Sequence, residues 1–79
     1  MTNLEKYNQI FIDIFDVKEE ELGDNFTKAE VEDWDSVRQM NILSQFEETF
    51  DVILDPEDMM TFKSYNAGKK ILAKNNIAL

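Results

Sequence analysis

The sequence predicts an all-α protein: a small four-helix bundle of three principal helices and one short helix, with a long first loop. The 79 residues leave room for one hydrophobic core, so residues 1–79 are expected to form a single domain. Apolar residues make up 43% of the chain, an ordinary fraction for a globular protein, and they recur at helical spacing. A chain this short buries only about 60–65% of its unfolded surface, which leaves little space for an enclosed active site.

The first helix is expected from Thr2 to Phe15. Thr2 and Glu5 have the spacing of a capping box at its start. An apolar stripe at helical spacing follows, and it consists of Leu4, Tyr7, Ile10, Phe11 and Ile14.

Residues 16–35 are expected to form a long connection. This segment holds the turn signal Gly23-Asp24-Asn25 and eight acidic residues between Glu19 and Asp35. Loops longer than about 15 residues without regular structure are uncommon and often functional. One short helical turn is expected at most, around Lys18–Leu22. The scattered apolar residues of the loop should pin it onto the bundle: Val17, Leu22, Phe26, Val31 and Trp34.

The second helix is expected from Ser36 to Phe50, because Met40, Leu43, Phe46 and Phe50 follow helical spacing. The apolar run Val52-Ile53-Leu54 after it is too short and isolated for a sheet, so we expect an extended link tucked into the core.

Two further helices complete the bundle. Asp55 is a good N-cap for a short third helix, and Pro56 suits its first position. Met59, Met60 and Phe62 are expected to give this helix its apolar cover. Ser64 caps a last helix that runs to about Lys74, within which Gly68 indicates close approach to a neighbouring element.

The acidic residues are concentrated in the first three-quarters of the chain. The formal net charge is −9. Residues 1–58 hold all 17 acidic residues and four basic ones, giving −13, whereas residues 59–79 hold only lysines as charged groups. Such a chain repels nucleic acids and anionic membranes, because both bind basic surfaces. The acidic part is expected to attract basic protein partners, in contacts that weaken as salt rises.

Cysteine and histidine are both absent. Disulfides are therefore excluded, which fits a reducing compartment. A zinc site would need carboxylates alone, and the commonest general base is missing, so an enzyme would have to work with Asp, Glu, Lys or Tyr. No apolar run approaches the ~20 residues that span a membrane. The N-terminal MTNLEKYNQI does not resemble a signal peptide, so we expect a cytoplasmic protein.

The most informative segment is Asp33-Trp34-Asp35-Ser36-Val37, where the acidic loop meets the second helix. With Ser36 as N-cap, Gln39 completes a capping box. The hydroxyl then accepts a hydrogen bond from a backbone amide, and the serine is structural. This is the commoner role for a serine that begins a helix. With Asp35 as N-cap, the carboxylate takes that amide and the Ser36 hydroxyl faces solvent. A phosphodiester on Ser36 would then lie at a helix N-terminus, with Arg38 as a nearby cation.

A longer pattern surrounds this segment. The Asp35-Ser36 pair is followed by the aliphatic Val37. Further along come Met40, Leu43, the run Phe46-Glu47-Glu48-Thr49-Phe50, and the segment Leu54-Asp55-Pro56-Glu57-Asp58. From Val31 to Leu72 this pattern resembles the acyl carrier protein family. The expected first helix and long loop also match the layout of that family, so the resemblance covers nearly the whole chain.

The resemblance implies a prosthetic group on Ser36. A phosphopantetheinyl transferase would transfer 4′-phosphopantetheine from coenzyme A to this serine, with Asp35 as helix cap and recognition residue. The terminal thiol would carry acyl groups as thioesters, so the protein would be a carrier and not an enzyme. As a monomer, it would present them to acyl-loading and acyl-transferring enzymes with basic docking patches. The expected recognition face on the second helix comprises Val37, Arg38, Met40, Glu47 and Glu48, although an isolated surface acid is more often simply solvated.

Several residues depart from the family pattern. Arg38 and Asn41 stand where many fatty-acid carriers have acids, which indicates a dedicated fatty-acid, polyketide or other specialised pathway. Trp34 is more reminiscent of aminoacyl or peptidyl carriers, including those of D-alanyl pathways, although loop packing also explains a tryptophan there. The interior residues Ile42, Phe46, Met60, Phe62 and Ile71 could line a space for the acyl chain, but we prefer a filled core.

Two alternatives involve no prosthetic group. In the first, the chain is an unmodified acidic module that binds a basic protein, and Ser36 is only a helix cap. In the second, it binds calcium, but the acids at 30–35 lack the alternating spacing, central glycine and terminal glutamate of an EF-hand loop.

Overall fold

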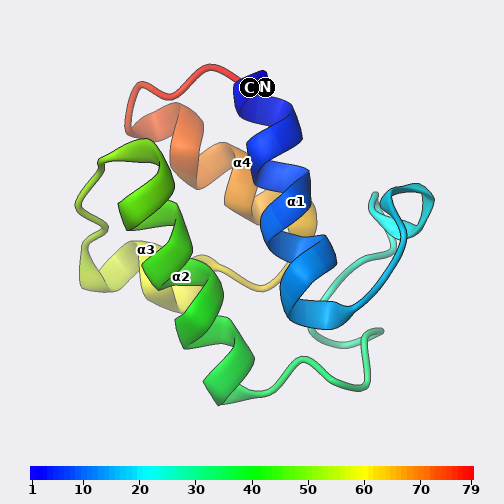
Figure 1. Cartoon of the computed structure of the whole chain (residues 1–79). Coiled ribbons are helices and arrows are strands. Elements are labelled where there is room, and N and C mark those ends of the chain that lie inside the picture. Colours follow the sequence, from blue (N-terminus) through cyan, green and yellow to red (C-terminus); the bar gives the residue numbers. More distant parts are fainter.

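The computed structural model describes all residues from 1 to 79 and consists of helices joined by loops (Figure 1). The helices are α1 (Asn3–Phe15), the 3-10 turn η1 (Glu19–Glu21), α2 (Ser36–Phe50), α3 (Pro56–Thr61) and α4 (Tyr65–Lys74). In Figure 1, α1 and α2 run in opposite directions, and the two chain ends lie together. The predicted small helical bundle is therefore confirmed. None of the helices has both the length and the apolar character needed to cross a membrane.

Side chains cap the helices where the sequence predicts. The Thr2 hydroxyl accepts from the Glu5 amide at 3.1 Å, and the Glu5 carboxylate accepts from the Thr2 amide at 3.0 Å, which completes the capping box. Asp55 and Ser64 each accept a hydrogen bond of 2.9 Å from the amide three residues further on. Each such cap satisfies an amide that the helix leaves unpaired, and contributes about 1 kcal/mol.

Aromatic rings dominate the core. Phe11 lies at its centre, with ring centroids of seven other aromatic side chains 5.1–6.3 Å from its own. These neighbours come from every part of the chain: Tyr7, Phe15, Phe26, Trp34, Phe46, Phe62 and Tyr65. Aliphatic side chains complete the core: Ile10, Ile42, Leu43, Leu54, Ile71 and Leu72.

The long loop is pinned onto this core, as predicted. Phe26 and Trp34 are buried, while Val17, Leu22 and Val31 pack against the core and are half-buried.

Backbone hydrogen bonds, which the sequence pattern did not predict, also hold the loop to the segment between α3 and α4. The Lys28 amide donates to the Lys63 carbonyl at 2.8 Å, and the Tyr65 amide donates to the Phe26 carbonyl at 2.9 Å. These two bonds fix the middle of the loop against the segment that leads into α4.

Three apolar residues that we expected in the core are exposed instead. Leu4 lies in the first turn of α1 and is 37% exposed. Ile53 is 89% exposed, because side chains alternate along an extended link and Leu54 takes the inward position. Met60 is 75% exposed, because a helix of only six residues buries one side, and Phe62 and Asp58 occupy it. The expectations that Ile53 tucks into the core and that Met60 covers or lines it are therefore wrong.

Buried polar groups tie α1 to α4. The Tyr7 hydroxyl donates to the Tyr65 carbonyl, and the Tyr65 hydroxyl donates to the side-chain oxygen of Asn8. Burial raises the pKa of both tyrosines, so both hydroxyls keep the proton that they donate. Gly68 faces this network: a Cβ at this position would lie 2.9 Å from the Phe62 ring and closer still to the Tyr7 hydroxyl. The predicted close approach at Gly68 is confirmed.

Candidate functional site

The start of α2 adopts the second of the two capping arrangements. Asp35 is the N-cap, with an extended backbone, and its Oδ1 accepts the Arg38 amide hydrogen at 2.8 Å. Ser36 is the first residue inside the helix. The carboxylate therefore satisfies the amide that a capping serine would have satisfied.

The Ser36 side chain is left free by this arrangement. The residue is exposed, and its hydroxyl forms no hydrogen bond within the protein. The amides of Ser36 and Val37 also have no partner, as expected for the first turn of a helix. An exposed hydroxyl thus lies beside two free amide donors, at the end of a 15-residue helix where the dipole favours an anion.

Ser64 provides an internal comparison. It stands immediately before α4, and its hydroxyl accepts a hydrogen bond from the Ala67 amide at 2.9 Å. This is the structural role that a serine at a helix start commonly has. At the start of α2, Asp35 has this role instead of Ser36.

Arg38 pairs with the capping carboxylate. Its Nη1 lies 3.1 Å from Asp35 Oδ2, in an ion pair whose side chains are 40% and 55% exposed. The Arg38 amide and then its guanidinium lower the pKa of Asp35, so this carboxyl stays ionised at neutral pH. The first turn of α2 contains no acidic residue. Directly around Ser36, the charge of Asp35 is therefore balanced by Arg38.

Trp34 packs into the core, and the loop-packing interpretation of this residue is confirmed. It is 4% exposed. Its Nε1 donates to Gln39 Oε1 at 3.1 Å, and Gln39 Nε2 donates to the Met59 carbonyl at 3.3 Å. Gln39 thus joins the loop before Ser36 to α3. Sequence reasoning missed this role, because a partner twenty residues away leaves no local pattern.

Apart from Arg38, which pairs with Asp35, the residues of the predicted recognition face divide into two groups. Val37 and Met40 are 70% and 53% exposed, and their spacing of three residues places them on one side of α2. Glu48 is also exposed and forms no ion pair. Glu47 differs, because its carboxylate accepts the Leu54 amide hydrogen at 3.1 Å and so holds the link that follows α2.

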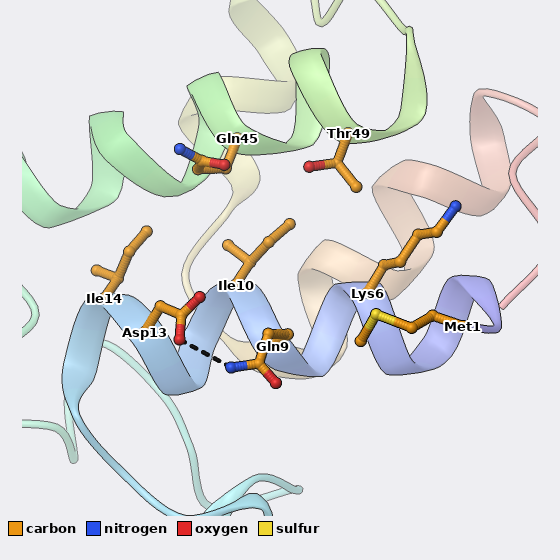
Figure 2. Close-up of a pocket in the computed structure, with 8 residues that line it drawn as sticks. All are labelled: Met1, Lys6, Gln9, Ile10, Asp13, Ile14, Gln45 and Thr49. Carbon is orange, nitrogen blue, oxygen red and sulfur yellow. Dashed lines mark hydrogen bonds between the residues drawn. The ribbon is translucent and has the colours of Figure 1, made fainter.

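A surface groove of about 290 Å³ lies between α1 and α2. Figure 2 shows Ile10 and Ile14 pointing from α1 toward α2, where Gln45 and Thr49 face them. Ser36 does not line this groove. Of the residues proposed to line an interior space, Ile42, Phe46, Phe62 and Ile71 are buried among other core side chains. These four residues therefore lie in a filled core, which is the interpretation that we preferred from the sequence.

No group of acidic, histidine or cysteine side chains is arranged to hold a metal ion. Comparisons with protein-family models, with curated proteins and with solved structures returned no match.

Proposed function

We propose that this protein is an acyl carrier, which carries acyl groups as thioesters on 4′-phosphopantetheine attached to Ser36. One observation carries the proposal: Asp35 caps α2, and the exposed Ser36 hydroxyl is left without a structural role. The resemblance of residues 31–72 to the acyl carrier family supports the same assignment. A helical bundle with a long first loop, which is the layout that the resemblance implies, also supports it.

The residues around Ser36 fit the prosthetic group. Its phosphodiester is an anion, and the free amides of Ser36 and Val37 are donors at a positive helix end. The Arg38 guanidinium is a further cation in the same turn. When attached, the group supplies a thiol, which the cysteine-free chain lacks.

The partners in this proposal are a phosphopantetheinyl transferase and acyl-loading and acyl-transferring enzymes with basic docking patches. Only Asp35, Asp55 and Asp58 among the acidic residues form ion pairs, so most of the negative charge is available to such partners. Val37 and Met40 would make apolar contacts beside Ser36, and Glu48 a charged one. Arg38 in place of an acid favours partners of a dedicated pathway.

Intact-mass spectrometry tests the proposal. Incubation of the wild-type protein with coenzyme A and a broadly acting phosphopantetheinyl transferase should add about 340 Da, the mass of one phosphopantetheine group. The Ser36→Ala variant should keep its helical circular dichroism spectrum and gain no mass. If no transferase modifies the folded wild-type protein, the alternative of an unmodified acidic binding module replaces the carrier.

A further inference from the structure

Helix α3 is too short to be stable by itself. It spans six residues, Pro56–Thr61, whereas isolated helices shorter than about 12–15 residues are marginal in water. Its position must therefore depend on contacts with the rest of the protein. Phe62, which ends the helix, is buried in the aromatic core, and two polar contacts hold α3 in addition.

The first contact joins α3 to the end of α4. Asp58 is 2% exposed, and its carboxylate accepts from Lys74 Nζ at 2.5 Å and from Asn75 Nδ2 at 3.5 Å. Lys74 also lies 4.0 Å from Asp55. The hydrogen bonds from Lys74 and Asn75 lower the pKa of Asp58, so a buried carboxylate is held in its charged form.

The second contact joins α3 to the start of α2. The Met59 carbonyl, adjacent to Asp58, accepts from Gln39 Nε2 at 3.3 Å. The other end of the Gln39 amide accepts from Trp34 Nε1 at 3.1 Å. Trp34 precedes the capping residue Asp35, so a continuous series of contacts runs from the end of α4 through α3 to the residues beside Ser36.

We propose that α3 docks and undocks as a unit, that the Asp58–Lys74 ion pair holds it docked, and that undocking is transmitted through Gln39 to Trp34 beside Ser36. The physical reason lies in Asp58. A buried carboxylate that loses its cation is strongly unfavourable, and α3 relieves this by moving Asp58 into water. Undocking also removes the Met59 carbonyl from Gln39, which frees the partner of the Trp34 indole.

Such a coupling needs one element with two arrangements that both sites influence, and we assign that role to α3. The proposal goes beyond the carrier function, because it concerns the unmodified protein and holds whether or not Ser36 accepts a prosthetic group. It would make the residues beside a modified Ser36 responsive to anything that binds Lys74.

The chain offers a matched control and an intrinsic probe. Lys70 lies one turn before Lys74 in α4, is exposed and forms no ion pair, so Lys70→Gln makes the same chemical change without the contact. Trp34 is the one tryptophan of the chain, so its fluorescence reports on the residues beside Ser36. The amides of Met59 and Phe62, which donate to the Asp55 and Asp58 carbonyls, report on α3.

The test measures amide hydrogen exchange and tryptophan emission of the unmodified protein at neutral pH. In Lys74→Gln, the Met59 and Phe62 amides should exchange at least about tenfold faster, while amides in the middle of α1 and α2 keep their rates. Trp34 emission should shift to longer wavelength. Lys70→Gln should behave as the wild type.

A double variant separates the proposal from simple destabilisation. Asp58→Asn removes the buried charge, so Asp58→Asn with Lys74→Gln should restore slow exchange in α3 relative to Lys74→Gln alone. The proposal is overturned by equal acceleration in all helices, by faster exchange in α3 without a change in Trp34 emission, or by the same effect in Lys70→Gln. None of these outcomes depends on whether a transferase modifies Ser36.

Discussion

Asp35 and Arg38, which precede and follow Ser36 in the sequence, contact each other twice. The Arg38 amide donates to Asp35 Oδ1 at 2.8 Å, and the guanidinium reaches Oδ2 at 3.1 Å. The first contact caps α2, and the second balances the charge of the cap. Because Asp35 and Arg38 provide the cap and balance its charge, we expect a chemical change at the Ser36 hydroxyl to leave the fold intact.

Substitutions at Asp35 and at Ser36 should therefore have very different effects on the free energy of unfolding. Asp35→Ala should lower the free energy of unfolding by about 1 kcal/mol, because the cap is lost, whereas Asp35→Asn should cost only a few tenths of a kcal/mol, as asparagine also caps. Ser36→Ala should change it by less than about 0.5 kcal/mol. Urea unfolding at pH 7 measures all three. A larger loss for Ser36→Ala than for Asp35→Ala would show that the serine is the cap.

The Asp58 carboxyl should make the free energy of unfolding depend on pH in the acidic range. Lys74 and Asn75 lower its pKa in the folded protein below the ordinary value of 3.8. Its contribution to stability is thus fully present above pH 3.8 and is lost as the pH falls through the lower, folded-state pKa. The wild type should be more stable than Asp58→Asn by a constant margin from pH 5 to 8, and the margin should shrink below about pH 4. A margin unchanged down to pH 2 would contradict this.

The Asp58–Lys74 ion pair should continue to stabilise the protein in mildly alkaline solution. Its partner Lys74 has a raised pKa, chiefly because of the hydrogen bond to Asp58. The stabilisation is therefore complete below the ordinary lysine pKa of 10.5 and is lost only as the pH rises above it. Thermal unfolding of the wild type and Lys74→Gln between pH 7 and 10 should show a constant difference; a difference that disappears by pH 9 would contradict the assignment.

Gly68→Ala should destabilise the protein, although alanine is the better helix former by about 1 kcal/mol. The new methyl would meet the Tyr7 hydroxyl and the Phe62 ring, and crowding of this kind costs about 1–3 kcal/mol. Tyr7→Phe removes the nearest obstructing atom, so Gly68→Ala should cost less in a Tyr7→Phe background. A double-mutant cycle by urea unfolding measures this coupling. Independent effects of the two substitutions would mean that the crowding is relieved elsewhere.

Two adjacent acids on α2 should prove to have different roles. Glu47→Ala removes the acceptor of the Leu54 amide and should cost about 1 kcal/mol of stability. Glu48→Ala should change stability by less than about 0.5 kcal/mol. If Glu48 contacts a basic transferase, its loss should slow modification of Ser36 at low salt, and the difference should shrink at high salt. A rate that is insensitive to Glu48 at low salt would remove it from the recognition face.

Local signals explain how much of the fold the sequence predicts. Each helix starts at a capping residue whose partner lies three positions on, so Thr2, Asp55 and Ser64 could be assigned from spacing alone. The second helix has the predicted bounds, Ser36–Phe50. The possible turn at Lys18–Leu22 is the 3-10 turn η1.

The failures occur where periodicity is too short to decide. Ile53 lies in a three-residue apolar run and Met60 in a six-residue helix, and neither segment is long enough to show which side faces inward. Exposure at both positions is set by the neighbouring elements.

The sequence locates the candidate site but does not decide whether Asp35 or Ser36 is the N-cap. Asp35 and Ser36 both have the chemistry and the position of an N-cap, and Gln39 fits a capping box with Ser36. Gln39 instead binds Trp34 and the Met59 carbonyl, and this depends on where α3 packs. Local spacing therefore supports both capping arrangements, and tertiary contacts decide between them.

Site localisation by tandem mass spectrometry is the most direct measurement of the carrier proposal. The chain contains serine at Ser36, Ser44 and Ser64, which lie at a free helix start, in the middle of a helix and at an occupied cap. After incubation with coenzyme A and a phosphopantetheinyl transferase, fragments of the folded wild-type protein should place one phosphopantetheine on Ser36 and none on Ser44 or Ser64. An unmodified chain, or the group on another serine, would contradict the proposal.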